Sequence, residues 1–162
     1  MTVVLVEGES DHVALEAAAS LLGRPMPRVV VLGGAHAARR VTAELRSSAP
    51  GERLVALVDA NEHDVVAPWV DVVHVCDRDL EDEVIRALGV ERVLAVLDAA
   101  GERESFGTLQ RQPAQRDRST VDQLRRFLGG RSGNKARYAA LLVDALAPDE
   151  VPAPLSAVLD ER

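Results

Sequence analysis

The sequence has few aromatic residues and a single cysteine, and each of these scarcities excludes some classes of function. Aromatic side chains make up 2% of the 162 residues, which argues against a platform that stacks the bases of a single strand. Cys76 is the only cysteine. An intrachain disulfide framework and a metal site built from several cysteines are therefore both excluded.

Long apolar runs are also missing. No run approaches the ~20 residues that a membrane-spanning helix needs, and the N-terminus lacks the pattern of a secretory signal. We therefore expect a cytoplasmic protein with no membrane partner. Hydrophobic residues still make up 47% of the chain, which is enough to bury a substantial core at this length.

Lysine is almost absent, since Lys135 is the only one and arginine carries the remaining positive charge. An isolated lysine can mark a position that needs a compact ammonium group instead of a planar guanidinium. The net charge of −7 argues against general binding of nucleic acid. Between residues 103 and 137, however, cationic residues outnumber acidic ones. This segment is either a phosphate-binding patch or a solvated helical face.

Three short apolar runs, each typical of a buried strand, end on carboxylates. The carboxyl ends of parallel strands share one edge of a sheet, where ligands of open α/β folds bind. Close carboxylates repel one another unless a cation or a proton lies between them. Hard oxygen ligands of this kind suit Mg²⁺ or Mn²⁺. The acids that we expect to form one divalent-metal site are Glu7, Asp11, Asp59, Asp79 and Glu81.

The order of apolar runs and helical faces predicts an α/β fold. Its sheet should be Rossmann-like, four-stranded and mostly parallel, with helices on both faces and a helical C-terminal extension. Residues 101–119 have little apolar periodicity and are predicted to form a long loop. We expect a single domain over residues 1–147, followed by a proline-rich tail at 148–162. Strands are expected at residues 3–6, 28–32, 53–58 and 70–76.

A set of short motifs resembles the Toprim domain. Val-Glu-Gly-Glu-Ser-Asp at residues 6–11 is followed by Asp59 and later by Asp79-Leu80-Glu81. The type that the chain resembles is the nuclease domain of the OLD (overcoming lysogenization defect) proteins, and standalone Toprim nucleotidyltransferase/hydrolase-like proteins look similar throughout. The resemblance covers most of the chain, including residues 131–138, and it implies a Toprim-like fold.

The resemblance also implies a site and a reaction. The family uses two divalent metals, bound by strand-end acids, to cleave phosphodiester bonds. Glu7 matches the family's first-strand glutamate and Lys135 its downstream lysine, so both are expected to be catalytic. The family's Asp-x-Asp is matched only by Asp59 followed by Asn61. Asn61 or Glu62 would have to supply the second oxygen.

Three functions are compatible with these residues. The leading one is a nuclease that acts on DNA or RNA, with Arg131 and Arg137 binding phosphates. The second is nucleotidyl or phosphoryl transfer on a small nucleotide, which the small size and net acidity favour. The third is a non-catalytic domain that binds metal or nucleic acid and regulates a partner. OLD proteins also carry an ATPase domain. Because this sequence has no Gly-x-x-x-x-Gly-Lys-Ser/Thr loop, ATP dependence would need a separate ATPase partner.

Overall fold

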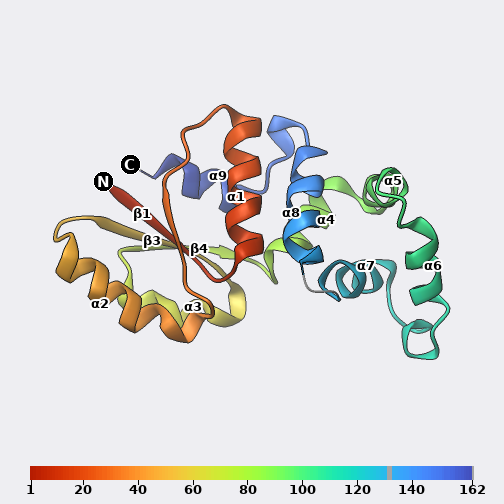
Figure 1. Ribbon diagram of the computed structural model, residues 1–162, viewed down its shortest axis with the longest axis horizontal. Helices are drawn as coiled ribbons and strands as arrows, with labels where there is room; N and C mark the ends of the chain where they lie inside the picture. Colours follow the sequence, from red (N-terminus) through yellow and green to blue (C-terminus); the bar gives the residue numbers. More distant parts are fainter. Residues whose placement is uncertain (131–132, 162) are drawn as a thin grey trace.

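Four strands form one parallel sheet in the order β2-β1-β3-β4 (Figure 1), as the sequence predicts. The computed structural model describes residues 1–130 and 133–161, so Arg131 lies outside the described residues. Every residue of β1 is buried because β1 is a central strand covered on both faces, and its sequence is therefore apolar without alternation. The strands are β1 (Thr2–Val6), β2 (Arg28–Val31), β3 (Arg53–Asp59) and β4 (Val72–Cys76).

Successive side chains of β1 enter two different cores, as the twofold period of a strand requires. Val4 and Val6 belong to the larger core, which lies under α1 (Glu9–Leu22), α8 (Asn134–Asp144) and α9 (Ala153–Asp160). Val3 and Leu5 belong to the smaller core. Two helices cover that opposite face (Figure 1), namely α2 (Ala38–Ser48) and α3 (His63–Val66).

A helical layer extends beyond the edge of the sheet (Figure 1). Within it, the ring of Phe127 lies 5.5 Å from that of Phe106 and 6.4 Å from that of Tyr138. These rings belong to the same core as the α1 face of the sheet, so α8 joins the layer to the sheet. The helices of this layer are α4 (Leu80–Leu88), α5 (Val90–Ala99), α6 (Arg103–Gln110) and α7 (Thr120–Gly129).

Two segments are more ordered than the sequence indicates. Residues 101–119, expected as a loop, contain α6, which is anchored by the fully buried Phe106. The expected proline-rich tail contains α9, which packs on α1, β3 and β4 and buries Leu155 completely. Pro154 lies in the first turn of α9, where a missing N–H removes no helical hydrogen bond. The prolines of this segment therefore do not indicate an unstructured tail.

The short connections are helical turns. Within residues 1–130 and 133–161, no helix combines the length and apolarity that crossing a membrane requires. The 3₁₀ turns are η1 (Ala35–Ala37), η2 (Ala60–Glu62), η3 (Ala67–Trp69), η4 (Pro113–Gln115) and η5 (Pro148–Glu150).

Candidate functional site

The carboxyl ends of β1 and β3 bring acids from distant parts of the chain together. Glu7 follows β1 directly and Asp59 ends β3, and these strands are neighbours in which Val6 pairs with Leu57. Because α1 begins just after Glu7, Asp11 lies in its first turn. A pocket of about 280 Å³ opens here, lined by Glu7, Gly8, Ser10, Asp11, Gly33, Gly34, Asp59 and Lys135.

Two glycines fix the backbone at the mouth of this pocket. The N–H groups of Gly33 and Gly34 both donate to the carbonyl oxygen of Glu7, at 3.0 and 3.2 Å. Their φ angles are 72° and 122°, which side-chain-bearing L-residues rarely adopt. The turn after β2 therefore holds the end of β1 and leaves the carboxylate of Glu7 at the pocket.

Two carboxylic acids of the pocket have strongly perturbed acidity. Burial raises the pKa of Asp11 to about 6, although a hydrogen bond from the Gly8 N–H and the charge of Lys135 act in the opposite direction. Burial also raises the pKa of Asp59 to about 6, and the negative charges of Asp11 and Glu7 add to this effect. Ionised carboxylates are therefore held together at an energetic cost, as at many functional sites.

Lys135 supplies the positive charge of the pocket from the first turn of α8. Its ammonium group lies 2.9 Å from the carboxylate of Glu81, at the start of α4. Burial alone would lower the pKa of Lys135, but the negative charges of Glu81, Asp11 and Asp59 outweigh that effect and raise it. Lys135 thus interacts with acids from both the sheet edge and α4.

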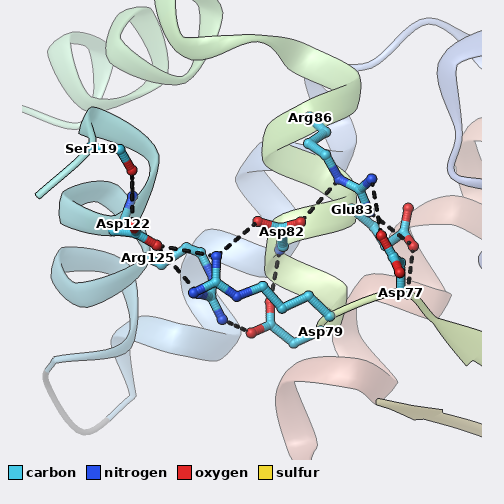
Figure 2. A network of polar contacts seen from close by, with 9 residues as sticks. Asp77, Asp79, Asp82, Glu83, Arg86, Ser119, Asp122 and Arg125 are labelled. Carbon is cyan, nitrogen blue, oxygen red and sulfur yellow. Dashed lines mark hydrogen bonds and ion pairs between the residues drawn. The ribbon is translucent and has the colours of Figure 1, made fainter. Parts of the chain in front are cut away.

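Asp79 does not line this pocket, although we expected it to be a metal ligand. Its carboxylate accepts a hydrogen bond from the Asp82 N–H at 2.8 Å and so caps α4. The same carboxylate forms an ion pair with Arg125 of α7 (Figure 2). Asp79 therefore lies at the junction of α4 and α7. Glu7, Asp11 and Asp59 line the pocket together with Lys135, and Glu81 pairs with Lys135.

The remaining predicted residues lie outside the pocket. Asn61 and Glu62 belong to η2, and neither lines the pocket beside Asp59. Arg137 bonds to Glu102 at 3.1 Å and lies over the ring of Tyr138. Its guanidinium group thus faces the helical layer, and a role in phosphate binding stays a prediction.

Sequence reasoning missed two kinds of residue near the site. Ser10 lines the pocket and is buried, but a serine at a helix start is too common to be singled out. Arg125 contacts Asp79, which precedes it by 46 residues. The spacing of Asp122 and Arg125, three residues apart on one helix, was the only available signal, and it cannot reveal a distant partner.

Three carboxylates in the pocket could hold a metal ion, namely Glu7, Asp11 and Asp59. In the part of the chain that the structure describes, no hydrogen bond is made to the carboxylate of Glu7 or Asp59. As the side chains stand, no three acidic, histidine or cysteine residues among those described are arranged to hold an ion. Binding therefore requires some of these carboxylates to turn toward a common centre. Their hard oxygen atoms and mutual repulsion fit Mg²⁺ or Mn²⁺.

The sheet order and the helical layer define a Toprim-like α/β domain, and solved structures agree with this class. The C-terminal region of the Burkholderia pseudomallei OLD protein superimposes with a TM-score of 0.66 at 16% identity, covering 98% of this chain and 95% of that chain. Two structures of the C-terminal region of the Xanthomonas campestris pv. campestris OLD protein give TM-scores of 0.64 at 23% and 21% identity, covering 98% of this chain and 92% of theirs.

This likeness concerns the fold, because identity is low over the whole length of the match. The expected resemblance to the OLD-type Toprim domain is therefore confirmed for the architecture. No protein-family model and no curated protein sequence matches the chain.

Proposed function

We propose that this protein hydrolyses phosphodiester bonds in nucleic acid with the help of a divalent metal. The observation that carries the proposal is the pocket at the sheet edge, where Asp11 and Glu7 lie close enough to Asp59 to raise its pKa. Such a cluster is costly to maintain without a cation. The fold shared with the OLD C-terminal regions agrees with the proposal.

Glu7, Asp11 and Asp59 would hold Mg²⁺ or Mn²⁺ in this pocket. A bound ion of this kind lowers the pKa of water and neutralises charge on a phosphate. The chain itself contributes the positions of the oxygen donors, which are set by β1, β3 and the first turn of α1. The glycine turn at Gly33 and Gly34 carries no side chain that would obstruct a phosphate.

Lys135 would stabilise negative charge that develops on the phosphoryl oxygens. Its ammonium group lines the pocket and is held by Glu81 at 2.9 Å. Because Glu81 comes from α4 and the other acids come from the sheet edge, the lysine is oriented from two sides. We therefore propose Glu7 and Lys135 as catalytic residues and Glu81 as the residue that positions Lys135.

The proposed function also implies a partner and a cellular location. Nucleic acid is the expected partner, and a cytoplasmic location fits a protein that acts on it. We also propose a separate ATPase partner as the source of any ATP dependence.

The test is cleavage of plasmid DNA, single-stranded DNA and RNA by the purified protein in Mg²⁺, in Mn²⁺ and in EDTA. We expect cleavage with metal, none in EDTA, and loss of cleavage in Asp59→Asn. Asp64→Asn is the matched control, because Asp64 follows the same strand but its side chain is 99% exposed. Cleavage that persists in EDTA, or that survives Asp59→Asn, would refute the proposal.

A second candidate is phosphoryl or nucleotidyl transfer on a small nucleotide. The pocket volume of about 280 Å³ is close to that of the smallest small-molecule sites, which begin near ~300 Å³, and the net acidity of the chain disfavours a polyanion. Nucleotide turnover without cleavage of any polymer would identify this activity. Metal binding with neither reaction would leave the third alternative, a regulatory domain.

A further inference from the structure

A second pocket, of about 300 Å³, lies where α7 meets the chain just before α4. Its wall is rich in arginine, and none of its residues lines the acidic pocket described above. It also differs from the Arg131 and Arg137 positions expected from the sequence. We name it the arginine pocket; its lining residues are Arg78, Arg118, Asp122, Arg125, Arg126 and Gly129.

Two of these arginines are fixed by neighbouring acids. Arg125 forms an ion pair with Asp79 and lies 3.8 Å from Asp122 (Figure 2). Arg78 lies 3.1 Å from Asp122 and 3.8 Å from Asp82. Because these planar guanidinium groups are held by Asp122 in the pocket wall and by Asp79 and Asp82 beside it, they are oriented before any ligand arrives.

The other two arginines leave the pocket with excess positive charge. Arg118 and Arg126 are exposed, and neither forms an ion pair with any residue that the structure describes. Arg78 also has 54% of its side chain exposed. The negative charge of Asp82 is also shared with Arg86, which lies 3.0 Å away, so it does not fully neutralise Arg78. The pocket can therefore accept an anion without breaking its own ion pairs.

Electrostatics supports the same conclusion. Burial lowers the pKa of Arg125 and the positive charge of Arg78 lowers it further, while the negative charge of Asp59 acts in the opposite direction. A hydrogen bond from Ser119 lowers the pKa of Asp122, and the charges of Arg78 and Arg118 contribute. Positive charges thus repel one another across the pocket, and an anion between them would relieve that repulsion.

We propose that the arginine pocket binds backbone phosphates of a nucleic-acid strand that also reaches the acidic pocket. The two pockets are joined by α4, because Asp79 at its cap holds Arg125 while Glu81 in its first turn holds Lys135. The acidic cluster repels a polyanion, so a strand needs cationic contacts beside it. The negative charge of Asp59 in the acidic pocket acts on Arg125 in the arginine pocket. Because the two pockets are neighbours, a polymer fits them better than a free phosphate, which could contact only one.

This inference rests on the proposed nucleic-acid substrate but not on hydrolysis, so it is tested by binding in EDTA. The probes are fluorescent single-stranded and duplex oligonucleotides, measured by anisotropy across a salt series. The variant is Arg118→Gln with Arg126→Gln, both on the surface. The control removes the same charge with Arg40→Gln and Arg46→Gln on α2, which covers the other face of the sheet.

We expect the pocket variant to bind roughly tenfold more weakly for each arginine, as loss of a charge-assisted hydrogen bond predicts. The slope of log affinity against log salt should also become shallower by about 0.7 to 0.9 per lost contact. The control pair should keep both the affinity and the slope of the unaltered protein.

Unchanged binding in the pocket variant, or an equal loss in the control, would overturn the inference. So would tight binding of inorganic phosphate or pyrophosphate by a protein that binds no oligonucleotide, because the pocket would then serve a free anion. Arginine-dependent binding without cleavage in Mg²⁺ or Mn²⁺ would instead reject the proposed hydrolysis and leave the inference standing.

Discussion

At the scale of single residues, the ionisation of Asp59 in the candidate site affects the stability of the folded protein. Its pKa rises from 3.8 to about 6 on folding, so the folded state binds its proton more tightly than the unfolded state. Ionised Asp59 therefore destabilises the fold as pH rises through this window, and the penalty disappears below pH 3.8. We expect Asp59→Asn to raise the melting temperature well above pH 6 and to leave it unchanged below pH 3.8.

Thermal unfolding across pH in EDTA measures this difference, with Asp64→Asn as the control of equal charge change. The advantage of Asp59→Asn should grow between pH 3.8 and about 6. If Asp59→Asn has the same pH profile as the unaltered chain, Asp59 carries no electrostatic penalty in the folded state.

Substitution of Lys135, again a single residue, tests its proposed role in catalysis. If its ammonium group acts on charge that develops in the transition state, Lys135→Ala should lower kcat by roughly 10²–10³-fold. KM should change far less. Lys135→Arg should rescue poorly, because a planar fork does not replace a point charge. Steady-state kinetics on a cleaved substrate decides this, and a fully active Lys135→Ala protein would remove Lys135 from the mechanism.

The sequence could predict part of this residue-level picture. Lys135 was identifiable because it is the only lysine, and Glu7 and Asp59 because they end apolar strands. Asp79 and Glu81 were indistinguishable, since both follow β4. Their separate positions depend on where α4 begins: Asp79 caps that helix, whereas Glu81 lies in its first turn beside Lys135.

At the scale of elements, the turn after β2 is the feature that positions Glu7. Gly34 has a φ of 122°, so a side chain there strains the backbone even though the space is open. Gly34→Ala should destabilise the fold by about 1–3 kcal/mol. Gly129→Ala is the control, because this glycine lies in α7 without a positive φ and alanine favours helices by about 1 kcal/mol.

Urea unfolding of the two glycine variants compares these effects directly. The midpoint should fall for Gly34→Ala and stay or rise for Gly129→Ala. Equal midpoints would mean that the turn tolerates a side chain and does not fix the end of β1.

Strands and helices could be predicted from the sequence where the apolar pattern is strong. They could not be predicted where only one or two buried side chains hold the element in place. The four strands were found because each is almost continuously apolar. In α6, Phe106 is the one fully buried anchor, so periodicity was too weak to indicate a helix. In α9, prolines suggested a tail, although Leu155 and Val158 are completely buried.

At the scale of the whole molecule, the site forms where the sheet and the helical layer meet. Glu7, Asp11 and Asp59 come from the sheet edge, whereas Glu81 and Lys135 come from α4 and α8. The parts share one hydrophobic core, so the charges converge only in the packed protein. A solved structure with a TM-score of 0.66 at 16% identity shows that this fold tolerates extensive sequence change.

The most direct test of a metal site at the sheet edge is thermal stability in a titration with Mn²⁺. An ion that binds only the folded state stabilises it by about 2.7 kcal/mol at a concentration of ~100 times Kd. We predict a melting temperature that rises with Mn²⁺ in the unaltered protein and in Asp64→Asn, with most of the rise lost in Glu7→Gln. A melting temperature that stays constant up to millimolar Mn²⁺ would contradict a metal site at this sheet edge.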